Sequence, residues 1–205
     1  MKKQHILAIL FLSGVWGLSE ALFGGWMYGA GMQLAPAVIL TVAAMGIMAI
    51  AKVYVPIAGS AIAVAALAML YKFLNQPFFA CHLLAILLLG ISFEVVYALT
   101  RGRYKPLIGL AATYTGFAVF AAMMILVFRY SWWTNPGWSK ALNYVGVTGS
   151  IAAALSAVAV PLADLFARRL QEHPARKLAI PNWAVLSAAS AGAWVFAVVR
   201  GLMVI

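Results

Sequence analysis

Long runs of apolar residues, separated by short connections that hold most of the polar and charged positions, make up this chain of 205 residues. A helix needs roughly 20 apolar residues to cross about 30 Å of hydrocarbon. Runs of this length therefore predict transmembrane helices rather than elements of a soluble core. The expected spans lie at residues 5–23, 34–51, 53–70, 78–99, 107–128, 144–167 and 183–200.

The runs are apolar on every face, which decides between the two kinds of membrane fold. Lipid offers backbone amides no water, so only helices and closed barrels cross it. Strands of a barrel would alternate polar and apolar residues at every second position, and this pattern is missing here. The predicted fold class is all-α: one domain over residues 1–205, a polytopic bundle of about seven transmembrane helices, with six as the alternative count.

The composition agrees with this fold class. The chain is 66% hydrophobic and 9% charged, whereas soluble domains carry about 25% charged residues. The N-terminal apolar run follows two lysines and so imitates a signal peptide. Glu20 interrupts the run and no clean small-x-small cleavage site follows it, so we interpret it as a retained first span.

The basic residues indicate an orientation. With a cytoplasmic N-terminus and seven spans, ten basic residues fall inside and four outside, in agreement with the positive-inside rule. A multi-pass protein of the cytoplasmic (inner) membrane is therefore expected. The inside set is Lys2, Lys3, Lys52, Arg101, Arg103, Lys105, Arg168, Arg169, Arg176 and Lys177, and the outside set is Lys72, Arg129, Lys140 and Arg200.

Several functional classes find no support in the residues. The net charge of +10 is spread between apolar runs, which fits contact with lipid headgroups and not a nucleic-acid groove. Cys81 is the single cysteine, so neither a disulfide framework nor a thiolate metal site is expected. The chain has no phosphate-binding loop and no H-E-x-x-H motif. We therefore expect no catalytic constellation, no metal and no cofactor.

Acidic residues inside a membrane are costly and by default point to function. Asp164 is followed one helical turn later by Arg168, a spacing that predicts a local ion pair. Glu94 lies in the inner third of its span, and structural and functional interpretations are equally open. Glu20 lies in the outer third of the first span, with no basic residue within a turn. His82 lies at a similar depth, so the two could anchor a polar ligand or relay a proton; alternatively, each bonds to a neighbouring helix.

The connections expected on the outer side are rich in aromatic and amide side chains. Such residues at an interface ordinarily form an aromatic belt. Placed above Glu20 and His82, they also provide the aromatic walls and sparse polar groups of a small-molecule pocket. The candidate ligand-binding residues are Glu20, His82, Trp26, Tyr28, Asn75, Trp132 and Trp138.

Small residues recur every fourth position in the first span, at Gly17, Ala21 and Gly25. Such a ridge lets two helices approach closely. It either packs within the bundle or docks a partner subunit, and the sequence leaves both interpretations open.

With this ridge, an aromatic outer loop set and no nucleotide site, the chain resembles the substrate-capture (S) subunits of energy-coupling factor transporters. Members usually have six spans. The resemblance implies a small-molecule ligand, a docking role for Gly17, Ala21 and Gly25 toward a transmembrane coupling subunit that works with ATPases, and a lid at residues 24–33.

The function expected from these features is transport, or substrate capture, of a small molecule in an outward-facing pocket. One alternative is a membrane-embedded enzyme or assembly factor acting on a lipid-like substrate. Another is a structural subunit of a larger membrane complex, in which Glu20 would pair with a partner's lysine or arginine.

Overall fold

The computed structural model describes residues 3–24, 26–27, 30–32, 35–74, 80–172, 188–196 and 199, and the regular structure within them is helical. This confirms the all-α prediction. The elements are α1 (Lys3–Ser19), η1 (Glu20–Gly24), α3 (Ala35–Tyr54), α4 (Ser60–Leu70), η2 (Tyr71–Leu74), α5 (Ala80–Leu99), α6 (Lys105–Ala122), η3 (Met123–Val127), α7 (Ser131–Thr134), α8 (Trp138–Asn143), η4 (Tyr144–Gly149) and α9 (Ser150–Glu172). A further helical segment covers residues 188–196.

Five helices in the described part of the chain are long and apolar enough to cross a membrane, which indicates a multi-pass membrane protein. They cover Lys3–Gly24, Ala35–Tyr54, Cys81–Leu99, Lys105–Val127 and Trp138–Glu172. The apolar helix Ser60–Phe73 is shorter than the other five.

This shorter helix differs from the predicted span at 53–70. The preceding helix continues to Tyr54, and residues 55–59 form a non-helical connection. Pro56, expected in the first turn of the span, lies in that connection, where its missing N–H removes no helical hydrogen bond. Gly59 ends the connection with a φ of 82°, a left-handed conformation that glycine adopts without steric cost. Helix α4 therefore begins only at Ser60.

The last two predicted spans also differ in extent from the structure. The span predicted at 144–167 belongs to a continuous stretch of 35 residues, Trp138–Glu172, which combines α8, η4 and α9. Pro161 lies inside α9 without ending it. The span predicted at 183–200 lies outside the described residues except for 188–196 and 199.

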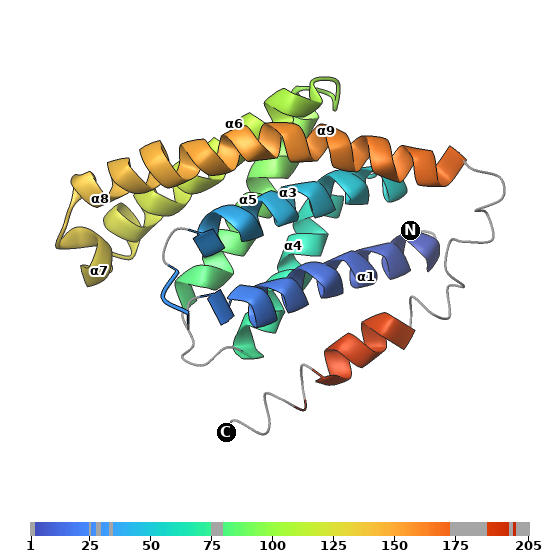
Figure 1. Ribbon diagram of the computed structural model, residues 1–205, viewed down its shortest axis with the longest axis horizontal. Helices are drawn as coiled ribbons and strands as arrows, with labels where there is room; N and C mark the ends of the chain where they lie inside the picture. The colour runs from blue at the N-terminus through green and yellow to red at the C-terminus, as the bar shows by residue number, and fades with distance from the viewer. Residues whose placement is uncertain are drawn as a thin grey trace.

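Successive helices pack as neighbours in a bundle (Figure 1). Helix α9 lies along one side and packs on α3 and α6; α5 packs between α4 and α6; and α1 packs on α3 and α4. The core contains large, fully buried side chains, which include Trp16, Met45, Met48, Phe93 and Ile108. Glycine permits close crossings: Gly90 of α5 meets Ala65 of α4, and a Cβ at Gly116 of α6 would lie 2.8 Å from Leu89 of α5.

The helices alternate in direction, so each end of the bundle collects a different set of helix ends and connections. The Glu20 end holds η1, η2, the start of α5, and the stretch from η3 to η4; the Glu94 end holds the end of α3, the start of α4, the connection between α5 and α6, and the end of α9. All the π turns in the described residues, η1, η3 and η4, lie at the Glu20 end. Such turns are rare and often mark functional sites.

Candidate functional site

A buried ion pair between Glu20 and Lys72 forms the centre of the candidate site. The Lys72 Nζ atom lies 2.8 Å from Oε2 of Glu20, and the two side chains are 4% and 9% exposed. The same ammonium donates a hydrogen bond to the backbone oxygen of Glu20 at 3.2 Å. The indole N–H of Trp16 donates to Oε1 of Glu20 at 3.3 Å. Both carboxylate oxygens therefore have a donor from within the chain.

Packing between α1 and the end of α4 brings Lys72 to Glu20. A Cβ at Gly17 would overlap the ring of Tyr71, so the glycine makes room for this tyrosine against α1. Tyr71 is 1% exposed and begins the 3₁₀ turn that also contains Lys72. Glu20 begins the π turn η1 one turn after Gly17. The Gly17–Tyr71 contact thus places the ammonium beside the carboxylate.

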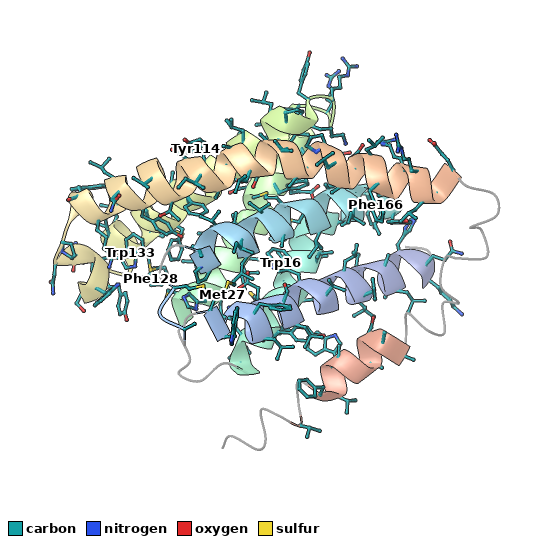
Figure 2. All side chains as sticks on the ribbon, in the orientation of Figure 1. Trp16, Met27, Tyr114, Phe128, Trp133 and Phe166 are labelled. Carbon is teal, nitrogen blue, oxygen red and sulfur yellow. The ribbon has the colours of Figure 1, made fainter. Side chains whose placement is uncertain are left out.

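His82, in the first turn of α5, joins this group. It interacts electrostatically with both Lys72 and Glu20, so the imidazole lies within range of the ion pair. Figure 2 shows the labelled Trp16 and Met27 near one another beside α1. The charges of Glu20 and Lys72 both act on His82. The partner that the structure places directly on Glu20 is Lys72. Lys72 entered the sequence-based prediction only as one of the charges that set the orientation in the membrane. The sequence did contain a signal for this pair. Lys72 is the single charged residue of its connection, which is expected on the same side of the membrane as Glu20, and Glu20 has no basic residue within a helical turn.

The aromatic candidates do not share one location. Trp26, Trp132 and Trp138 are exposed, and α7 and α8 pack with α6, η3 and η4, whereas Glu20 belongs to the elements around α1, η2 and α3. Lys140 lies 4.1 Å from the ring centroid of Trp132 and donates to its backbone oxygen at 2.8 Å. Trp132 and Trp138 therefore belong to a separate aromatic region. Tyr28 and Asn75 lie outside the described residues.

That separate region has a buried centre that sequence reasoning did not single out. Trp133 is buried and makes edge contacts with Phe120 and Tyr144, with ring centroids 5.5 and 5.1 Å apart. Such pairs contribute about 0.5–1.5 kcal/mol beyond area burial. Trp133, visible with Phe128 beside α7 in Figure 2, therefore anchors the α7–α8 region to α6.

The small-residue ridge is used at least partly inside the bundle. Gly17 is buried against Tyr71, which agrees with the packing interpretation at that position. Ala21 is half-buried. Gly25 lies outside the described residues.

Glu94 has a different role from Glu20. Its carboxylate lies 2.6 Å from Nζ of Lys52 and accepts hydrogen bonds from the backbone N–H groups of Gly59 and Ala61, at 2.9 and 3.1 Å. These N–H groups belong to the start of α4, where intrahelical acceptors are missing. Glu94 therefore caps α4 from α5 and fixes the sharp connection after α3.

Asp164 forms the second ion-pair group at the Glu94 end. The predicted pair with Arg168 is confirmed at 2.7 Å, and Lys105 of α6 adds a second cation at 2.7 Å. Tyr97 lies between this group and the Glu94 pair, with Lys105 and Lys52 at 4.9 and 5.1 Å from its ring centroid. These contacts join the ends of α3, α5, α6 and α9.

The Glu20 end thus offers a buried anion and a buried cation with a half-buried imidazole in electrostatic range, which suits recognition of a charged or strongly polar small molecule. Within the described part of the chain, no group of three or more His, Cys, Asp or Glu side chains has the geometry to hold a metal ion. In comparisons with known proteins, no family model, no curated protein and no solved structure matches the chain.

Proposed function

We propose that the chain is a membrane transport or substrate-capture protein that binds a small molecule at its Glu20 end. The observation that carries this proposal is the buried Glu20–Lys72 ion pair, with His82 in electrostatic range. Charges within a membrane are expensive, and most of them line substrate or ion pathways. Helix packing alone therefore does not explain why this ion pair is present.

The other two acid groups provide a contrast that supports this choice. Glu94 accepts hydrogen bonds from the backbone N–H groups at the start of α4. Asp164 binds Lys105 of α6 and Arg168 of α9 and so joins the ends of these two helices. Both have an evident structural task. Among the described residues, the Glu20 side chain bonds Lys72 and Trp16 and no backbone N–H group of a helix start. Glu20 also begins a π turn, a feature frequent at functional sites. Function is thus the better explanation for Glu20 than for the other two.

The pairing of Glu20 also bears on the structural-subunit alternative. That alternative needs a partner's lysine or arginine to neutralise Glu20. The chain's own Lys72 already does so at 2.8 Å. A partner is therefore not required to stabilise the carboxylate, and we favour a ligand.

The proposed location is the cytoplasmic membrane, with the Glu94 end in the cytoplasm and the Glu20 end outside. Basic residues of the described chain support this orientation under the positive-inside rule. At the Glu94 end are Lys3, Lys52, Arg101, Arg103, Lys105, Arg168 and Arg169; at the Glu20 end are Lys72, Arg129 and Lys140. The chain then binds its ligand from the outer side.

The test is capture of small molecules from native membranes. The chain is purified in mild detergent, and the molecules extracted from it are identified by mass spectrometry. We expect a compound enriched on the wild-type protein and depleted on Glu20→Gln and Lys72→Met. Uptake of that compound into proteoliposomes then distinguishes a carrier from a capture subunit.

The matched control is Arg129→Gln, which removes an exposed basic charge at the same end and leaves the ion pair intact. It should retain the compound at the wild-type level. Recovery of no enriched compound, or equal recovery on all variants that remain folded, would refute a binding role for the Glu20 end.

A further inference from the structure

Resting on the proposed function, we propose that the Glu20–Lys72 pair binds a zwitterionic small molecule of the amino-acid type. The ligand's carboxylate takes the place of Glu20 beside Lys72, and its ammonium takes the place of Lys72 beside Glu20. One internal ion pair is thereby exchanged for two ion pairs with the ligand. This names the substrate class of the site.

The first step is that, of the three acids that form ion pairs among the described residues, Glu20 has a single cation and no backbone donor. Glu94 accepts from a lysine and from two backbone N–H groups, which cannot swing away. Asp164 is held by two cations from two helices. Glu20 has one cation and one long indole hydrogen bond of 3.3 Å. Separation of Glu20 from Lys72 therefore breaks one cation–carboxylate contact, together with the hydrogen bond from Lys72 to the Glu20 backbone oxygen, whereas Asp164 would have to lose two cations.

The second step is that the surroundings restrict what can separate the pair. Both side chains are almost fully buried, and an uncompensated charge in such a place is strongly unfavourable. An anion that bound Lys72 alone would leave the Glu20 carboxylate without a cation. A cation that bound Glu20 alone would leave the Lys72 ammonium without an anion. A ligand that carries both charges leaves neither unpaired and keeps the net charge of the site unchanged.

The third step is geometric. The two charged groups of an α-amino acid are attached to one carbon, so they are as close together as the charges of the internal pair they replace. The indole N–H of Trp16 remains available to orient the Glu20 carboxylate.

His82 adds a third polar group within electrostatic range of both charges. We assign it an electrostatic role. Substitution His82→Ala should therefore weaken binding less than loss of either member of the ion pair.

The experiment measures equilibrium binding of the twenty radiolabelled proteinogenic amino acids, first pooled and then singly, to the full chain in lipid nanodiscs. At least one should bind. Its N-acetyl derivative lacks the cation and its methyl ester lacks the anion, and each should bind about 100-fold more weakly, the effect expected when one partner of a buried charge pair is removed.

Single variants should change the preference as well as the strength. Glu20→Gln leaves Lys72 alone and should favour the N-acetyl derivative over the amino acid. Lys72→Met leaves Glu20 alone and should favour the methyl ester. The double exchange Glu20→Lys with Lys72→Glu keeps an ion pair, and should recover zwitterion binding to within about 10-fold of the wild type.

A variant without either charge, Glu20→Gln with Lys72→Met, keeps the test decisive if a single variant does not fold, because it leaves no buried charge unpaired. Zwitterion binding at the wild-type level by this double variant would overturn the proposal. So would capture of a ligand that is not zwitterionic, and in that case the proposed capture function would still stand. Absence of any captured or transported molecule would refute the proposed function itself.

Discussion

Gly109 of α6 lies directly against the backbone of Ser156 in α9. A Cβ built on Gly109 would overlap the carbonyl carbon and oxygen of Ser156. Both helices belong to candidate membrane spans, and α6 and α9 form one of the main helix pairs of the bundle. Close approach through a glycine is a common way for membrane helices to gain dispersion contacts. The crossing depends on this residue because backbone atoms cannot move aside as a side chain can.

We therefore expect Gly109→Ala to destabilise the protein by about 1–3 kcal/mol or more, the usual cost of overpacking. Gly146→Ala is the control, since nothing lies within 4 Å of a Cβ at that position. It should be neutral or slightly stabilising, by about 0.5–1 kcal/mol, because alanine loses less conformational freedom. Thermal unfolding in detergent, followed by size-exclusion chromatography, measures both. Equal melting temperatures for the two variants would contradict the crossing.

The contact between Gly17 and Tyr71 gives a second prediction. Gly17→Ala should lower stability by about 1–3 kcal/mol, because the methyl group would overlap the Tyr71 ring. It should also weaken ligand capture, since Tyr71 precedes Lys72. The matched control is Gly14→Ala, whose Cβ would lie 3.4 Å from the Tyr71 hydroxyl and needs only a small adjustment. A Gly17→Ala protein of wild-type stability that has lost a co-purifying subunit would instead support the docking interpretation of this ridge.

The Lys52–Glu94 pair gives a third prediction. Glu94→Gln leaves a buried lysine without its anion, and Lys52→Met leaves a buried carboxylate without its cation. Each should cost about 3–5 kcal/mol of unfolding free energy. The double variant removes both charges, so it should be more stable than the sum of the two losses implies, with a coupling of about 1–3 kcal/mol. A double-mutant cycle from unfolding in mixed micelles measures this coupling. Additive losses would show that the two charges do not stabilise each other.

Local features of the fold could be predicted from the sequence, because hydrophobic length and helical spacing are properties of neighbouring residues. The pairing of Asp164 with Arg168 followed from positions four apart on one helix. The start of α4 did not follow from hydropathy, because residues 55–59 are largely apolar although they are not helical. Hydropathy counts apolar residues. Continuation of the helix through residue 56 would also need a backbone N–H group to hydrogen-bond the preceding turn, and Pro56 has none.

The candidate site depended on contacts that no local pattern contains. Lys52 and Glu94 are 42 positions apart, and Lys72 and Glu20 are 52 positions apart. Which helices become neighbours decides these pairs, and packing details such as the Tyr71 ring over Gly17 set that arrangement. A common depth could be predicted for Glu20 and His82 from their distance to the span ends. The cation that pairs with Glu20 comes from η2, an element 52 positions further along the chain, so it could not.

The orientation of the bundle gives the last prediction, tested with two exposed positions at opposite ends. Arg103 lies in the connection between α5 and α6, and Trp132 lies in α7 and is 69% exposed. In a Cys81→Ser background, Trp132→Cys should react with a membrane-impermeant maleimide in intact cells. Arg103→Cys should react only after the membrane is opened, because the proposed orientation, based on the clustered basic residues, places that end in the cytoplasm. The reverse pattern would invert the proposed orientation and move the Glu20 site to the cytoplasmic face. Labelling of both positions in intact cells would mean that the long helices between them do not separate two compartments.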